Sequence, residues 1–79
     1  MTAWADLDQK SLDAYLWTVA EEVCTEKELA ALKFWNAGWT YREMAPMLGV
    51  KYATAWENVK RGLERIAKRM DEREREVAA

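Results

Sequence analysis

Two capping-box sequences constrain the fold of this chain more than any other feature. In a capping box, a Thr hydroxyl and a Glu carboxylate three residues later bond to free backbone N–H groups at the start of a helix. Thr25–Glu28 and Thr40–Glu43 both have this spacing, and each precedes a glycine that can end a helix, Gly38 and Gly49. The sequence therefore predicts two short helices separated by tight turns, the first of them starting at Glu26.

Apolar residues at helical spacing predict one further helix on each side of this pair. The preceding helix is expected from about Leu7 to Val23, and the following one from Tyr52 to about Glu76. Their apolar residues recur every three or four positions: Leu12, Tyr15, Leu16, Val19 and Val23 in the first, and Ala55, Val59, Leu63, Ile66 and Met70 in the second. The expected fold is all-α, a small bundle of about four helices with a long C-terminal helix.

Length and composition argue against a catalytic or metal-binding function. The 79 residues make one small domain, with no His and a single Cys, Cys24. The commonest general base and metal ligand is therefore missing, and neither an internal disulfide nor a multi-Cys zinc site can form. We expect no enzyme activity, no metal and no cofactor, and we expect Cys24 to be a small buried apolar side chain.

The sequence favours a cytoplasmic protein. No stretch without a charged residue approaches the roughly 20 residues that a membrane-spanning helix needs. Asp6 and Asp8 lie where a secretory signal would have a basic patch and an apolar run. We therefore expect neither membrane insertion nor secretion. Small size and five Trp are also compatible with a phage protein.

The net charge of −2 conceals an uneven distribution along the chain. Residues 1–50 carry four cations and eight anions, whereas residues 51–69 carry six cations and two anions. The last ten residues carry two cations and four anions. Because local positive charge attracts the phosphates of nucleic acids, the predicted C-terminal helix is the candidate for a nucleic-acid-binding surface.

A helical wheel separates two faces of this C-terminal helix. One face is apolar and belongs to the core: Ala55, Val59, Gly62, Leu63, Ile66 and Met70. The opposite face is mostly charged, and it holds Ala53, Glu57, Lys60, Arg61, Glu64, Arg65 and Lys68. Trp56 falls on the border, either packed beside Leu63 or reaching a ligand. The charged face is either a solvated surface with intrahelical ion pairs or a binding surface.

The segment from Thr25 to Arg69 resembles the helix-turn-helix of sigma factor region 4 and of the LuxR-type response regulators. The resemblance covers more than half of the chain and rests on matches in the same order: Cys24–Leu32, Gly38–Ala45, Leu48–Val50, Thr54, Arg61 and Ile66. A small Ala45 lets two helices cross closely, and Gly49 allows the tight turn between them. In these families such a turn presents the N-terminal half of the next helix to a DNA major groove.

The resemblance implies two sets of DNA-contacting residues. Those expected to face bases are Tyr52, Ala53, Trp56, Glu57, Lys60 and Arg61. Those expected to hold phosphates are Arg42, Lys51, Arg65 and Lys68. Lys60 and Arg61 can donate to guanine, and Glu57 can accept from a cytosine amine. Tyr52 or Trp56 can contact a thymine methyl or a sugar.

The sequence departs from the pattern of these families at several positions. Pro46 lies inside the short third helix, where it removes a hydrogen bond and favours a kink. The other departures are Lys51 in place of a Ser or Thr cap, Ala55 in place of Val, Asn58 in place of His or Arg, and Gly62 in place of Ala. Residues resembling the promoter-melting part of a sigma factor are absent, so a stand-alone domain of region-4 type is expected.

These observations predict a sequence-specific transcriptional regulator that binds double-stranded DNA. A homodimer is expected, because one such helix reads few base pairs. Residues 1–24 would be an N-terminal helix for packing or dimerisation, 25–70 the helix-turn-helix domain, and 71–79 a charged helical tail. The alternative is a protein-interaction module on the same scaffold, binding RNA polymerase or another regulator through Trp39, Trp56 and the acidic N-terminal half.

Overall fold

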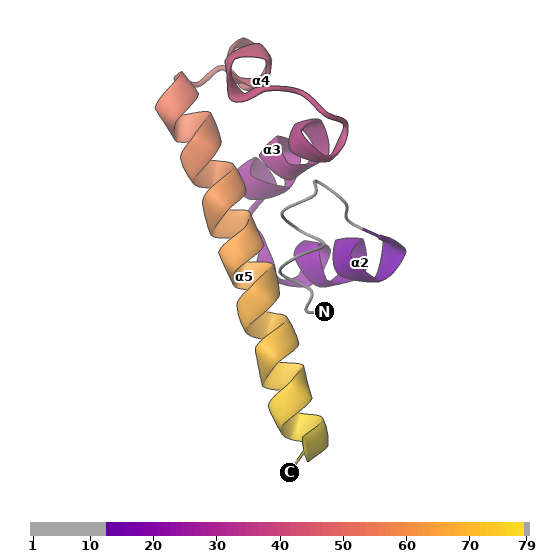
Figure 1. Ribbon diagram of the computed structural model, residues 1–79. Helices are drawn as coiled ribbons and strands as arrows, with labels where there is room; N and C mark the ends of the chain where they lie inside the picture. The colour runs from indigo at the N-terminus through magenta and orange to yellow at the C-terminus, as the bar shows by residue number, and fades with distance from the viewer. Residues whose placement is uncertain (1–12, 79) are drawn as a thin grey trace.

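Four helices follow one another in the computed structural model, which describes residues 13–78. They are α2 (Ala14–Val23), α3 (Glu26–Asn36), α4 (Tyr41–Leu48) and α5 (Tyr52–Ala78), and the described residues contain no strand. α5 runs the length of the molecule, and α4, α3 and α2 lie beside it in that order from its N-terminal end (Figure 1). The predicted all-α bundle with a long C-terminal helix is confirmed.

Both predicted capping boxes form. Thr25 Oγ1 accepts a hydrogen bond from the Glu28 backbone N–H at 3.2 Å, and Glu28 Oε1 accepts one from the Thr25 N–H at 3.0 Å. The corresponding distances for Thr40 and Glu43 are 3.2 and 2.9 Å. The bonds from Thr40 hold the pKa of the Glu43 carboxyl below its ordinary value. The starts of α3 and α4 are therefore set by the residues that the sequence indicated.

Glycines end α3 and α4 as predicted. Gly38 and Gly49 have φ of 91° and 69°, in the left-handed region that a side chain disfavours. At the end of α4 the Val50 N–H donates to the Ala45 carbonyl at 3.0 Å. α4 continues through Pro46 as far as Leu48, so residues 49–51 are all that separates α4 from α5.

The first described helix begins later than predicted. Asp13 has an extended backbone (φ −80°, ψ 177°), and its side chain accepts a hydrogen bond from the Leu16 N–H at 2.9 Å. Asp13 is thus the N-cap of α2, and a helix begins directly after its N-cap residue. The prediction of one continuous helix from about Leu7 is wrong at this point. Residues 1–12 lie outside the described part of the chain.

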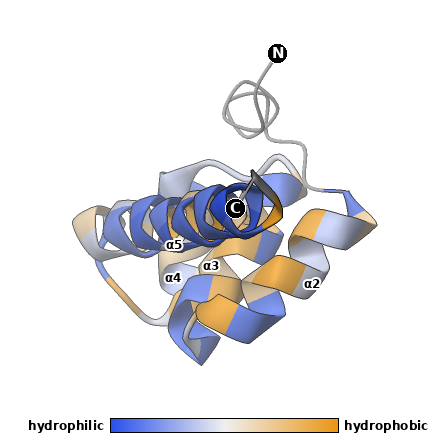
Figure 2. Ribbon diagram, turned by 90° about the horizontal axis from the view of Figure 1, so that it is seen from below, coloured by the Kyte–Doolittle hydropathy of each residue, from blue (hydrophilic) through white to orange (hydrophobic). Residues whose placement is uncertain are grey.

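The core lies where α2, α3 and α4 pack on the apolar face of α5. On α5, Ala55, Val59 and Ile66 are almost fully buried, as the wheel predicted. The side chains that cover them from the other helices include Leu16, Val19, Leu32, Trp35 and Met44. In the ribbon of Figure 2, most residues of α5 are coloured as hydrophilic, whereas hydrophobic segments are prominent in α2.

Gly62 brings α3 and α5 close together. A Cβ atom at this position would lie 2.8 Å from Leu32 Cδ1, inside van der Waals contact. Because Leu32 is fully buried, it has little room to give way. The departure from the usual Ala at Gly62 therefore has a packing reason.

Candidate nucleic-acid interface

The residues that the sequence assigned to DNA contact are exposed without exception. Arg42 lies on α4, Lys51 in the short connection, and the others on α5. We use the term α4–α5 surface for the group at the N-terminal end of α5: Arg42, Lys51, Tyr52, Ala53, Trp56, Glu57, Lys60 and Arg61. Arg65 and Lys68 lie farther along the same helix and are treated separately.

Two cations of the α4–α5 surface are held over aromatic rings. The Arg42 guanidinium carbon lies 5.9 Å from the centroid of the Tyr52 ring, and Lys60 Nζ lies 5.1 Å from that of Trp56. Tyr52 and Trp56 keep 54% and 43% of their surface exposed. Both rings therefore belong to the outer surface and orient the neighbouring positive charges.

Tyr41 joins this surface, although the sequence analysis did not select it. Its ring meets the Tyr52 ring edge to face, with centroids 6.1 Å apart. Partial burial, followed by the neighbouring Tyr52, raises the pKa of the Tyr41 hydroxyl. The sequence feature that could have indicated Tyr41 is its position between the N-cap Thr40 and the candidate phosphate ligand Arg42. Tyr41 ties the N-terminal ends of α4 and α5 together.

Arg61 remains available to a ligand. Its guanidinium approaches Glu57 at 3.9 Å, one helical turn away, with 63% and 53% of the two side chains exposed. Exposed pairs at this spacing contribute about 0.3–0.5 kcal/mol, so a stronger acceptor can displace Glu57. Glu57 in turn keeps its carboxylate oxygens accessible for a donor.

Arg65 forms an ion pair with a residue of α3. Its Nε lies 3.0 Å from Glu28 Oε1, and Glu28 is only 4% exposed. The same carboxylate therefore caps α3 and binds a cation on α5. Only the capping role of Glu28 was predictable from the sequence, because the ion pair joins residues 37 positions apart.

Lys68 lies two turns beyond Arg61, the last residue of the α4–α5 surface. It follows Tyr52 by sixteen residues, which corresponds to about 24 Å along a helix axis. Glu64 and Asp71 flank it on the same face of α5. The predicted phosphate set is thus divided: Arg42 and Lys51 lie at the N-terminal end of the base-facing group, whereas Arg65 is paired with Glu28 and Lys68 lies between Glu64 and Asp71.

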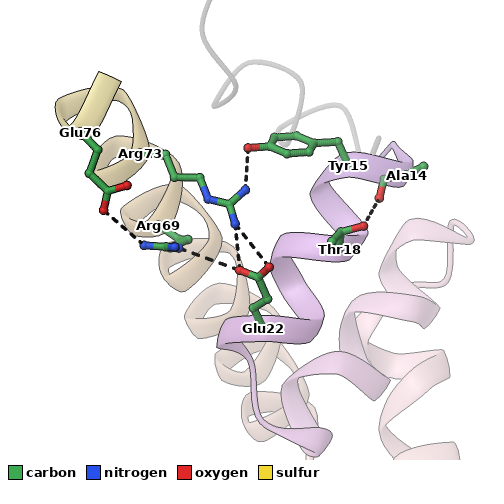
Figure 3. Close-up of polar contacts among 7 residues, drawn as sticks. All are labelled: Ala14, Tyr15, Thr18, Glu22, Arg69, Arg73 and Glu76. Carbon is green, nitrogen blue, oxygen red and sulfur yellow. Dashed lines mark hydrogen bonds and ion pairs between the residues drawn. The ribbon is translucent and has the colours of Figure 1, made fainter. Parts of the chain in front are cut away.

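The C-terminal half of α5 uses its arginines to hold α2. Arg73 donates to the Tyr15 hydroxyl at 2.8 Å and to Glu22 at 3.0 Å (Figure 3). Arg69 approaches the same Glu22 carboxylate at 4.0 Å and Glu76 at 3.9 Å. The hydrogen bond to Tyr15, and then the Glu22 charge, raise the pKa of Arg73. These cations are matched by the protein's own groups.

Cys24 is half-buried where α2 joins α3. Its Sγ donates to the Gly62 carbonyl of α5 at a distance of 3.6 Å. Burial, and then the nearby Glu28 carboxylate, raise the pKa of the thiol to about 11. The thiol is therefore protonated at neutral pH, and it packs against the core as a small apolar group.

Residues 13–78 contain no cluster of His, Cys, Asp and Glu of the kind that holds a metal ion. No helix among them is both long enough and apolar enough to span a bilayer. Comparison of the chain with protein-family models, with curated proteins and with solved structures finds no match. The exposed side chains of the α4–α5 surface are therefore the basis for assigning a function.

Proposed function

We propose that this protein is a sequence-specific DNA-binding transcriptional regulator that uses α4 and α5 as a helix-turn-helix. One observation carries the proposal, namely that exposed cations and exposed aromatic rings share the α4–α5 surface. The chain as a whole has a net charge of −2. The local excess of positive charge therefore results from where the charged residues lie and not from the overall composition. Such a surface fits the phosphates and base edges of duplex DNA.

The dimensions of α5 suit a major groove. A helix with its side chains is about 10–12 Å across, and the major groove of B-DNA is about 12 Å wide. Residues 52–61 extend about 14 Å along α5, which corresponds to roughly four base pairs. The first three turns of α5 would enter the groove, while Arg42 and Lys51 meet the flanking phosphates.

The proposed contacts follow from the chemistry of each side chain. Lys60 and Arg61 donate to the O6 and N7 atoms of guanine, and Glu57 accepts from a cytosine amine. Tyr52 and Trp56 contact thymine methyl groups or sugars. Since Lys60 already lies against the Trp56 ring, it loses less conformational freedom on binding than a free lysine side chain.

A second candidate is a protein-interaction module, and the exposed apolar side chains favour it. Tyr52 and Trp56, which lie against cations of the α4–α5 surface, are 54% and 43% exposed, and Met47 on α4 is 64% exposed. An acidic, partly apolar surface of RNA polymerase or of another regulator would complement them. The two candidates share Trp56, but the interaction module would also use Trp39 and the acidic N-terminal half of the chain.

Selection of binding sites from a random duplex library, at low and at physiological salt, tests the proposal. We expect a recovered motif of a few base pairs, repeated as two half-sites if the protein binds as a dimer. Affinity should fall by about 0.9 log units per log unit of salt for each phosphate neutralised. Failure to recover any motif, with weak binding that salt abolishes, would move the assignment to the protein-interaction module.

A Glu57→Gln variant sharpens this experiment. Gln prefers adenine where Glu accepts from cytosine, so the preference at one base pair should change while the rest of the motif is retained. Glu64→Gln is the matched control, since Glu64 is an exposed carboxylate on the same helix, two turns farther on. A motif unchanged by Glu57→Gln would show that α5 does not enter the groove in the proposed register.

A further inference from the structure

The side of α3 opposite the core carries an apolar groove of about 560 Å³. We call it the outer α3 groove, and its apolar lining consists of Leu29, Ala30, Phe34, Ala37 and Trp39. The Phe34 and Trp39 rings meet edge to face with centroids 4.6 Å apart, so they form a fixed wall. The buried residues of α3 lie on its other face: Glu28, Ala31, Leu32 and Trp35.

Two charged residues in this groove have no counter-charge within the part of the chain that the structure describes. Glu26 and Lys33 also line it, and neither makes an ion pair with any residue in the range 13–78. They are seven residues apart, or about 10 Å along the helix axis. The point midway between them falls between Leu29 and Ala30, at the centre of the apolar lining.

This arrangement is complementary to itself. Rotating a second copy by 180° about the midpoint lays the two α3 helices antiparallel. Glu26 then faces Lys33 of the partner subunit, and Lys33 faces Glu26 of the partner subunit. Leu29 faces Ala30 of the partner subunit, where a small side chain leaves room for a large one. A two-fold interface requires a surface of this kind, in which one patch meets its own copy.

We infer that the outer α3 groove is the interface of a symmetrical homodimer, occupied by α3 of a second copy of this chain. The two ion pairs determine the register, and the apolar lining provides the buried surface. The groove shares no residue with the α4–α5 surface, so both copies keep that surface free. The inference stands without the proposed DNA binding, because it rests on α3 and the turn that follows it.

Sedimentation equilibrium in the absence of DNA, over a range of protein concentrations, tests the inference. We expect a species of twice the 9.2 kDa chain mass. Glu26→Lys and Lys33→Glu should each raise the dimer dissociation constant about tenfold or more, because two attractive pairs become two repulsive ones. An equimolar mixture of the two variants should recover the dimer, since one chain then presents two cations to two anions.

The double variant E26K/K33E restores the complementarity within one chain and should dimerise like the original protein. Glu21→Lys is the matched control, because Glu21 is an exposed carboxylate on α2 without an ion pair among the described residues. Circular dichroism establishes that each variant is folded. A monomer at every concentration, or a dimer that neither single reversal weakens, would overturn the inference. Neither result depends on whether the protein binds DNA.

Discussion

The two halves of α5 carry the same kinds of cation in opposite circumstances. In the N-terminal half, Lys60 lies on an exposed ring and Arg61 has a weak partner at 3.9 Å. In the C-terminal half, Arg69 and Arg73 both contact Glu22 of α2. The first pair is available to a ligand, whereas the second holds the fold together. A count of cations along the helix does not separate these roles, but their partners do.

The boundary between the halves lies near Arg65, which pairs with the buried Glu28. The helical wheel placed Arg65 and Lys68 on the charged outer face, together with Lys60. A wheel describes one helix and contains no information about the acidic residues of its neighbours. The comparison therefore predicts that substitutions in the two halves affect different properties, namely DNA affinity and stability.

The largest expected effect is on DNA affinity. Lys60→Ala combined with Arg61→Ala should weaken binding to a selected site by about 2–3 kcal/mol, roughly 30- to 150-fold. The matched control, R69A/R73A, also removes two cations from α5 but should leave the affinity nearly unchanged. Fluorescence anisotropy with a labelled duplex measures both. Equal losses of DNA affinity in the two double variants would mean that the two halves of α5 contribute equally to binding and that the number of cations alone determines it.

The next effect concerns Cys24, which lies beside the midpoint of α5. Raising the thiol pKa from 9.0 to about 11 lowers the thiolate fraction below pH 9 by about 100-fold, so alkylation should be slower by that factor. The rate should rise with pH up to about 11. Because the folded state keeps this proton longer than the unfolded chain, stability should fall between about pH 9 and 11.

Iodoacetamide modification followed by mass spectrometry measures the rate, with the urea-unfolded protein as the reference. The R69A/R73A variant should react faster, since Cys24 directly follows α2 and those arginines hold α2 on α5. A folded protein that reacts as fast as the unfolded chain would contradict the protected environment described for Cys24.

A smaller effect distinguishes the two carboxylates that pair with arginines of α5. Glu28→Ala removes a cap and a partly buried ion pair, and should lower the free energy of unfolding by about 2 kcal/mol. Glu57→Ala removes an exposed pair, and should change it by no more than about 0.5 kcal/mol. Glu28→Gln keeps an acceptor for the Thr25 N–H and should be intermediate. Urea denaturation measures all three, and similar values for Glu28→Ala and Glu57→Ala would contradict the assignment.

The smallest effect is expected within the C-terminal half. Arg75 pairs with Asp71 on the same helix at 3.1 Å, and 80% of its side chain is exposed. Arg75→Ala should therefore change the free energy of unfolding by at most about 0.5 kcal/mol. Arg73→Ala should lower the midpoint of thermal unfolding clearly, because it releases Tyr15 and Glu22 of α2. If the two variants melt alike, contact with α2 is not what stabilises this half.

Features that depend on neighbouring residues in the sequence were predictable. The capping boxes at Thr25 and Thr40 and the left-handed Gly38 and Gly49 are local, and each lies where the sequence indicated. The apolar face of α5 also followed from its spacing. The start of α2 was predicted too early, although Asp13 is a good capping residue, because Leu12 continues the apolar spacing of Tyr15, Leu16 and Val19 across it.

Features that join distant parts of the chain were not predictable. The contacts from Arg65 to Glu28 and from Arg73 to Tyr15 span 37 and 58 positions. Their formation depends on how α2 and α3 cross α5, and a one-dimensional pattern does not contain that angle. The candidate site was predicted as a set of exposed residues, but its aromatic–cation pairs and the role of Tyr41 needed the folded arrangement.

The position of α5 in the bundle also bears on how the protein folds. Each of α2, α3 and α4 packs against α5, and α5 follows all three in the sequence. A nascent chain that ends before α5 lacks the surface on which the other three helices bury their apolar sides. Folding of these helices must therefore wait until α5 is synthesised, and it should then occur as one cooperative transition.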